Sequence, residues 1–96
     1  MRVRVSGHSM YPTYRDGDVV EVDVDAYAEQ LPQVGDVVLA EHPFKTGVCI
    51  VKRVKRITDE GRVFVVGDSP LESSDSRGFG ALRPAQILGK VTGTHD

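Results

Sequence analysis

The stretch VCIVKRVKR, residues 48 to 56, joins an apolar run to an alternation of apolar and basic side chains. β-branched residues are common in it, and such residues favour strands. Period-two alternation places Lys52 between apolar neighbours on one face of this strand. These neighbours are Val48, Ile50 and Val54. The stretch therefore predicts a strand that carries a lysine among apolar side chains.

Further stretches of the same character lie on both sides and are separated by turn-forming residues. They are residues 2–5, 18–24, 36–40, 62–66 and 87–92. The sequence Asp59-Glu60-Gly61 predicts a hairpin turn, and helical signal is limited to a turn after Met10-Tyr11-Pro12 and another at 84–86. We therefore expect a mainly β fold: a compact antiparallel sheet or barrel with little helix.

Length and composition indicate a single globular domain over residues 1–96, with 40% hydrophobic and 27% charged residues. The net charge of −2 disfavours nucleic-acid binding, and the one dense basic cluster is confined to residues 52–56. No apolar run approaches the roughly 20 residues that span a bilayer, and no secretory signal precedes the domain. The sequence predicts a cytoplasmic protein with no membrane contact.

The first candidate for chemistry is Ser9, in the segment SGHSMYPT that follows the first strand and ends in a proline-induced turn. Gly7 would let a substrate backbone approach closely, and the amide of Ser9 could donate to a developing oxyanion. The alternative is that Ser9 only satisfies backbone groups at a turn, as many serines do.

A serine nucleophile needs a base, and the three histidines are poorly placed for that role. On an extended segment His8 points away from Ser9, His42 lies in a predicted loop, and His95 is next to the C-terminus. Lys52 is the better candidate, because an apolar site penalises the charged form of a lysine. The alternative is an edge-strand lysine with its amine in water.

The third candidate segment is residues 67–80, in which small, hydroxyl and charged side chains crowd between two strands without periodicity. A serine hydroxyl here could position a lysine amine, and a charge-assisted bond from Asp75 to Arg77 could lock the loop. A plain solvated loop is the alternative. Cys49, the only cysteine, has apolar neighbours and is expected to be a small buried hydrophobe.

These three segments together resemble the conserved boxes of the signal peptidase I family. They are SMYPT at 9–13, KRV at 52–54 and GDSPLESSDSR at 67–77, followed by FG at 79–80 and ILGK at 87–90. The resemblance implies the catalytic-core fold of that family, with Ser9 as nucleophile and Lys52 as general base. It also implies that Ser73 orients the lysine amine and that Asp75 and Arg77 hold the loop.

The sequence departs from larger members of that family in two respects. Gly7 stands where some members have an oxyanion-hole serine, which implies an oxyanion hole built from the backbone of Gly7 and Ser9. The membrane anchor and the extra β-domain are absent, which favours a soluble substrate. The whole chain, including EHPF at 41–44, is similar to the nickel-type superoxide dismutase maturation proteases. This implies a partner: a protein precursor with an N-terminal extension, such as nickel superoxide dismutase.

We expect the substrate to bind as an extended strand beside the segment that leads to Ser9. The expected pocket walls are Val5, Met10, Tyr11 and Val54. No cofactor or metal is predicted, since nickel would belong to the substrate. Two alternatives remain: a signal peptidase catalytic core without its anchor, and a non-catalytic or LexA-like regulatory β-domain. A large separation of Ser9 and Lys52 would favour the non-catalytic one.

Overall fold

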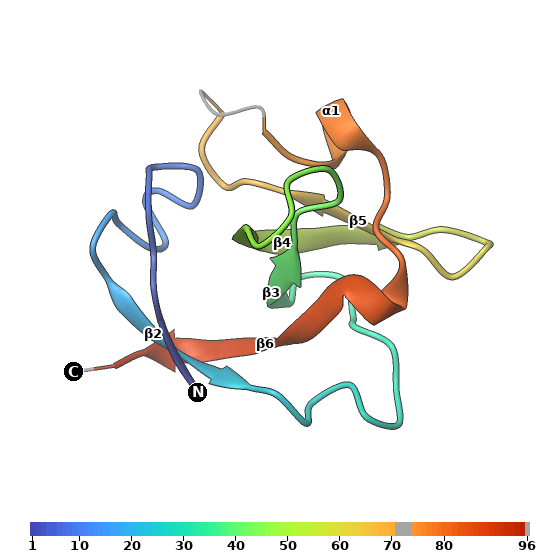
Figure 1. Cartoon of the computed structure of the whole chain (residues 1–96), viewed down its shortest axis with the longest axis horizontal. Helices are drawn as coiled ribbons and strands as arrows, with labels where there is room; N and C mark the ends of the chain where they lie inside the picture. The colour runs from blue at the N-terminus through green and yellow to red at the C-terminus, as the bar shows by residue number, and fades with distance from the viewer. Residues whose placement is uncertain (71–73, 96) are drawn as a thin grey trace.

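The computed structural model describes residues 1–70 and 74–95 and has one antiparallel sheet in the order β1-β2-β6-β3-β4-β5 (Figure 1). The strands are β1 (Arg2–Arg4), β2 (Val19–Asp23), β3 (Val37–Glu41), β4 (Cys49–Ile57), β5 (Val63–Val66) and β6 (Ile87–Thr94). Each of the six predicted stretches forms one of these strands, with ends that differ by at most two residues. The prediction of a mainly β fold with little helix is confirmed.

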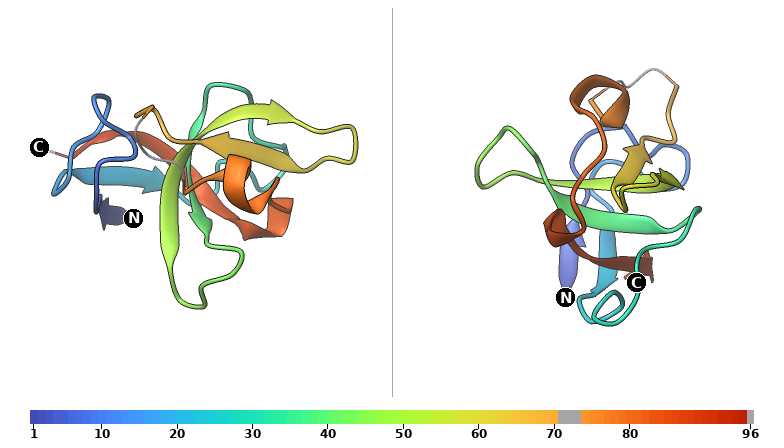
Figure 2. Two further views of the ribbon diagram at one scale, coloured as in Figure 1. Left: turned by 90° about the horizontal axis from the view of Figure 1, so that it is seen from above. Right: turned by 90° about the vertical axis from the view of Figure 1, so that its right-hand side faces the viewer.

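The sheet is strongly coiled, so that β1, β2 and β6 form one half and β4 and β5 the other, with β3 between them (Figures 1 and 2). Register shifts bend the sheet at three pairings: β2 with β6, β3 with β6, and β4 with β5. Such bulges increase local twist and redirect a strand. They let one sheet of short strands wrap around its own side chains.

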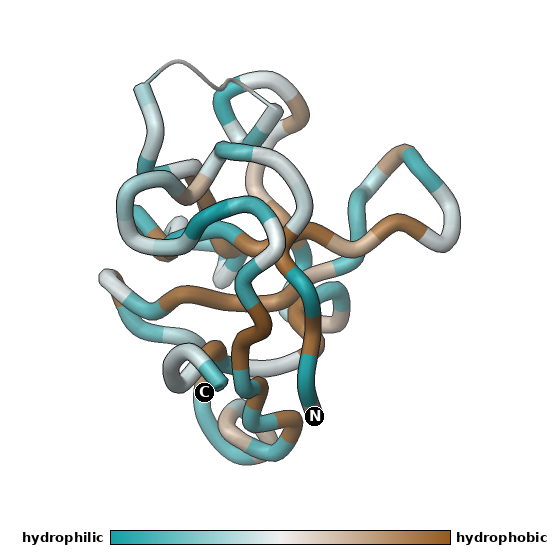
Figure 3. Tube along the Cα trace, turned by 90° about the vertical axis from the view of Figure 1, so that its left-hand side faces the viewer, coloured by the Kyte–Doolittle hydropathy of each residue, from teal (hydrophilic) through white to brown (hydrophobic). Residues whose placement is uncertain are grey.

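Strand β3 is buried on both faces and separates two hydrophobic clusters. Val37 and Leu39 pack with Val5, Met10, Val20, Val22 and Val91. Val38 and Ala40 pack with Val54, Val63, Val65 and Leu82. Hydrophobic residues follow the strands while hydrophilic ones gather in the connecting loops (Figure 3). Successive side chains of β3 therefore point alternately into the two hydrophobic clusters, and the strand contributes to both.

The helical elements are short. The turn predicted at 84–86 is the 3₁₀ helix η1 (Pro84–Gln86), with proline at its start. The segment after Met10 forms hydrogen-bonded turns and no helix. A four-residue helix, α1 (Ser76–Phe79), was not predicted, because one turn shows no helical periodicity. In the described part of the chain, no helix is long and apolar enough to cross a membrane.

Candidate active site

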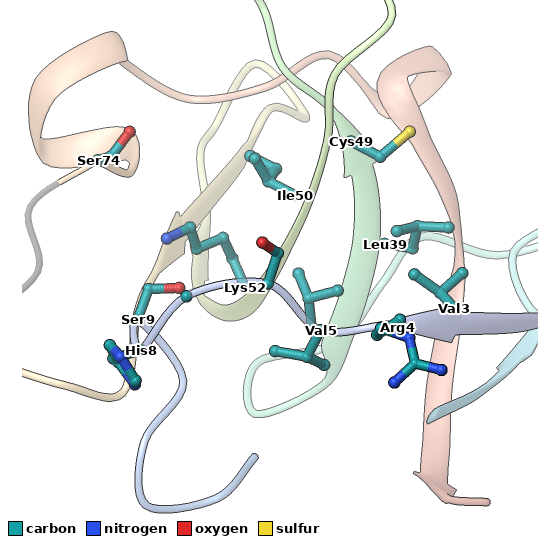
Figure 4. Close-up of a pocket in the computed structure, with 13 residues that line it drawn as sticks. Val3, Arg4, Val5, His8, Ser9, Leu39, Cys49, Ile50, Lys52 and Ser74 are labelled. Atoms are coloured by element: carbon teal, nitrogen blue, oxygen red, sulfur yellow. The ribbon is translucent and has the colours of Figure 1, made fainter. Parts of the chain in front are cut away.

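Ser9 and Lys52 line the same pocket, which has a volume of about 240 Å³ (Figure 4). Its walls come from residues 3–9, which continue from β1, from residues 49–52 of β4, and from Leu39 and Ser74. Residues 43 positions apart in sequence are thus brought together by the sheet and by the loop that follows β1. The geometry agrees with a joint role and disfavours the alternative in which the two lie far apart.

Lys52 lies in the middle of β4, opposite Val38 of β3, and its side chain is 4% exposed. Strand β4 is an interior strand between β3 and β5, which excludes an edge-strand lysine with its amine in water. Figure 4 shows the amine end of Lys52 pointing toward Ser9. Ile50 and Val54 are apolar neighbours on its face as expected, but Val48 precedes the strand and is exposed.

The backbone of Ser9 is fixed by the loop that follows β5. The carbonyl oxygen of Ser9 accepts a hydrogen bond from the amide of Ser69 at 2.9 Å. Gly67 lies so close that a Cβ on it would be 2.6 Å from that same oxygen. On the other side of Ser9, the buried Met10 anchors the turn in the core. These contacts determine where the Ser9 hydroxyl is presented.

The expected backbone oxyanion hole needs one correction. The amide of Gly7 donates to the carboxylate of Asp16 at 2.8 Å, so it is already engaged. A φ of 88° at this position explains why the residue is glycine. Across residues 1–70 and 74–95, the amide of Ser9 donates to no other group. Of the two expected donors, only the amide of Ser9 is available.

Asp68 joins all three candidate segments, a role that the sequence did not reveal. Its carboxylate accepts two hydrogen bonds from the guanidinium of Arg53, at 2.8 and 2.9 Å, and one from the hydroxyl of Thr13. Arg53 also donates to the carbonyl of Gly35 at 2.8 Å. The hydrogen bond from Arg53 lowers the pKa of Asp68 and, despite partial burial of both groups, raises the pKa of Arg53.

The bond expected between Asp75 and Arg77 is present, with 2.6 Å between the Asp75 carboxylate and Nη2 of Arg77. The fully buried Asp75 carboxylate also accepts from the amide of Arg77, which caps α1, and from the amide of Gly67. Burial alone would raise the pKa of Asp75, but the hydrogen bonds from Arg77 and Gly67 lower it to about 2. Asp75 therefore connects α1 to the glycine that contacts Ser9.

The orienting serine and the pocket walls were also predicted from the sequence. Ser73, the expected orienting residue, lies outside the described residues. Its neighbour Ser74 lines the pocket. Of the expected pocket walls only Val5 lines the pocket, whereas Met10 and Val54 are buried in the core and Tyr11 is exposed elsewhere.

The turn after Ser9 rotates Met10 inward, and the packing of β5 covers Val54. The apolar walls are instead Val3, Val5, Leu39, Ile50 and Val51. Two of these walls, Val3 and Val5, could have been predicted, because they alternate with polar residues along the first strand.

The histidines form no catalytic set with Ser9. The ring of His8 is exposed and turned away from Lys52 (Figure 4), and His95 contacts Glu21 on β2. His42 accepts hydrogen bonds from the amides of Phe44 and Lys45. Within residues 1–70 and 74–95, no three His, Cys, Asp or Glu side chains gather where they could hold a metal ion.

The expectation for Cys49 was wrong, because Cys49 is exposed. It is the first residue of β4 and pairs with the exposed Glu41 at the end of the hairpin that adjoins its loop. Apolar neighbours in sequence do not reveal where a strand leaves the covered part of a sheet. Cys49 lies at the rim of the pocket that holds Ser9 and Lys52.

Comparison with known proteins places the chain in a family of peptidase type. The chain belongs to the Peptidase S24-like family, whose profile matches residues 1–92. It is 33% identical over 105 residues to mitochondrial inner membrane protease subunit 1 of Xenopus tropicalis, which covers 90% of this chain and 63% of that protein. The family and this relative agree with the predicted relationship to signal-peptidase-like and LexA-like peptidases.

Similarity also extends to core protein VP3 of Bluetongue virus 2 (isolate USA), at 39% identity over 66 residues. That match covers 69% of this chain but 7% of the viral protein. The chain thus spans less than two thirds of the length of each of these relatives. The relation to nickel superoxide dismutase maturation proteases stays a prediction.

Proposed function

We propose that the chain is a serine endopeptidase in which Ser9 is the nucleophile and Lys52 the general base. The observation that supports it most directly is the shared pocket, into which a lysine that is 4% exposed reaches toward Ser9. Burial penalises the ammonium form and thereby favours the neutral amine that a general base requires. Membership of a peptidase family supports the same chemistry.

The reaction has two steps. In the first, Nζ of Lys52 takes the proton of the Ser9 hydroxyl while Oγ bonds to the scissile carbonyl carbon. The intermediate then breaks its C–N bond, and Lys52 returns the proton to the leaving amine. In the second step Lys52 takes a proton from water, the hydroxide attacks the ester, and the C–Oγ bond breaks as Ser9 recovers its proton.

The amide of Ser9 would stabilise the oxyanion that forms in both steps, since it donates to no other described group. Asp75, Arg77 and Ser73 would act as positioning residues. Asp75 holds Gly67, which contacts Ser9, and Ser73 would orient the amine of Lys52. This mechanism calls for no metal or cofactor.

The proposed substrate is a protein precursor from which an N-terminal extension is removed, and the precursor of nickel superoxide dismutase is the first to test. The resemblance of the three boxes and of residues 41–44 to the maturation proteases of that enzyme supports this choice. We place the reaction in the cytoplasm, where such a precursor would be available.

The test is mass spectrometry of the precursor after incubation with the parent protein and three variants: Ser9→Ala, Lys52→Met and Lys52→Arg. We expect the parent alone to release the extension, because arginine stays charged and methionine cannot take a proton. Lys55→Met, at an exposed position of the same strand, is the matched control and should cleave like the parent. Cleavage by Lys52→Met at the parental rate would exclude the proposed base.

A second candidate substrate is a signal peptide, as expected for the catalytic core of a signal peptidase. The similarity to mitochondrial inner membrane protease subunit 1 supports it. The same variants incubated with signal-peptide substrates in detergent would separate the two candidates. Cleavage of signal peptides with an intact dismutase precursor would favour this second substrate over the first.

A further inference from the structure

A second pocket adjoins the one that holds Ser9 and Lys52. Its volume is about 460 Å³, and it lies between the β3–β4 hairpin, residues 41–49, and three residues of the C-terminal part: Arg83, Gln86 and Leu88. Cys49 lines both pockets. A peptide that lies over Ser9 and follows the start of β4 therefore passes from the first pocket directly into the second.

The hairpin presents apolar side chains to solvent at this place. Phe44 is 76% exposed and Val48 is 43% exposed, and both line the second pocket together with Leu88. Exposed apolar groups at the rim of a pocket are typical of surfaces that bind a partner. These three side chains give the pocket an apolar part that suits a bulky apolar side chain, next to its polar lining residues Glu41, Lys45, Arg83 and Gln86.

The hairpin is held in a defined shape by its own hydrogen bonds. Nδ1 of His42 accepts from the amides of Phe44 and Lys45, each at 3.1 Å, and the amide of His42 donates to the carbonyl of Val48 at 2.8 Å. The ring of His42 also meets that of Phe79 in α1 edge to face, at 5.3 Å between centroids. A loop ordered before binding loses less entropy when a ligand arrives.

We propose that this second pocket is a distal subsite that binds a bulky apolar side chain in the N-terminal extension of the substrate. The inference rests on the proposed peptidase function. Cys49, where the second pocket begins, is three residues or about 10 Å from Lys52 along the strand, and Phe44 and Val48 lie beyond it, so the apolar side chain would lie roughly four to six residues from the cleaved bond. The extension stays attached to Ser9 in the acyl-enzyme. Contacts between the extension and the second pocket are therefore present both during acylation of Ser9 and during hydrolysis of the acyl-enzyme.

Cleavage of two peptides from the N-terminus of the nickel superoxide dismutase precursor tests the subsite. One keeps about ten residues before the cleaved bond and the other about three, too few to reach the second pocket. Phe44→Ser and Val48→Ser should each lower kcat/KM for the long peptide, by about tenfold for Phe44→Ser. Neither should change it for the short peptide. The control is Val34→Ser, which removes an exposed apolar side chain that lines neither pocket.

Equal losses on both peptides, or no loss on either, would overturn the subsite. A loss that instead requires residues after the cleaved bond would overturn its assignment to the extension. Binding of the long peptide to Ser9→Ala, measured by fluorescence anisotropy, tests the subsite apart from catalysis. Weaker binding by the double variant Ser9→Ala/Phe44→Ser supports the subsite even where no peptide is cleaved, and unchanged binding contradicts it.

Discussion

Gly67 lies directly against Ser9: a methyl group on Gly67 would be 2.6 Å from the carbonyl oxygen of Ser9 and 3.3 Å from its Cβ. The backbone of Gly67 is not in the left-handed region, so space rather than conformation requires glycine here. Because Asp75 holds the amide of Gly67, the glycine cannot easily move away. Any added side chain must therefore displace Ser9.

We expect Gly67→Ala to fold but to lose most peptidase activity. Overpacking of this kind costs about 1–3 kcal/mol of stability, whereas a displacement of the nucleophile by about 1 Å can lower the rate by about 100-fold. Gly89→Ala is the matched control, since a Cβ there would be 2.7 Å from the carbonyl oxygen of Asp23, in β2. The measurements are thermal unfolding and kcat on the same preparations.

Both variants should lose stability, but only Gly67→Ala should lose activity per folded molecule. A similar loss of kcat in the two variants would show that crowding acts through the whole fold and not through Ser9.

Asp68→Asn should loosen the connection between the three segments of the site. The asparagine keeps an acceptor but loses the charge that pairs with Arg53, and hydrogen bonds to charged groups contribute about 1.5–3 kcal/mol each. We expect a fall of that order in the free energy of unfolding, measured with urea, and a lower kcat. The control Glu21→Gln weakens the exposed pairs with Arg2 and His95, which solvent screens, and should lower the free energy of unfolding much less. Equal effects of the two changes would contradict the role given to Asp68.

Asp75 should make the fold sensitive to acid. Its pKa is lowered from 3.8 to about 2 in the folded chain, so its contribution is complete above pH 3.8 and is lost as the pH falls toward 2. The shift corresponds to about 2 kcal/mol. The difference in free energy of unfolding between the parent and Asp75→Asn should therefore shrink by that amount between pH 5 and pH 2.

The control for this measurement is Asp59→Asn, in the exposed turn between β4 and β5. It measures the pH dependence that the loss of an exposed acidic side chain brings by itself. A pH dependence of Asp75→Asn no larger than that of Asp59→Asn would mean that the buried carboxylate does not couple folding to pH.

The sheet could be predicted because its signal is local. Alternating or continuous stretches rich in β-branched residues marked all six strands, and the apolar neighbours of Lys52 indicated its burial. The exposure of Cys49 could not be predicted in this way, because it depends on where the hairpin extends beyond the covered part of the sheet. Helix α1 was missed because its single turn is defined by the cap at Asp75 and not by periodicity.

The site was predicted as a set of residues but not as a network. Sequence resemblance pointed to Ser9, Lys52 and Asp75, yet only the structure shows that Asp68 bonds to residues of the other two segments. The amide of Gly7 is engaged by Asp16, nine residues later, through a turn whose geometry the sequence does not specify. Contacts between segments distant in sequence depend on the coiling of the whole sheet, which period-two patterns do not encode.

The β3–β4 hairpin should loosen as His42 gains a proton. Its Nδ1 accepts the amides of Phe44 and Lys45, and a protonated ring cannot accept. Burial, together with the charge of Lys45, lowers the pKa of His42 below 6.5, so the neutral form is favoured in the folded chain. The hairpin bonds are therefore intact above pH 6.5 and are lost as the pH falls through the lowered pKa.

Hydrogen exchange measures this directly: protection factors of the Phe44 and Lys45 amides should fall with decreasing pH while those of β3 stay unchanged. His42→Asn is the informative variant, because an asparagine oxygen can accept the same bonds and does not titrate. Its protection should be independent of pH. If the parent shows no more pH dependence than His42→Asn, then His42 does not control the hairpin, and the shape of the second pocket depends on the strand pairing alone.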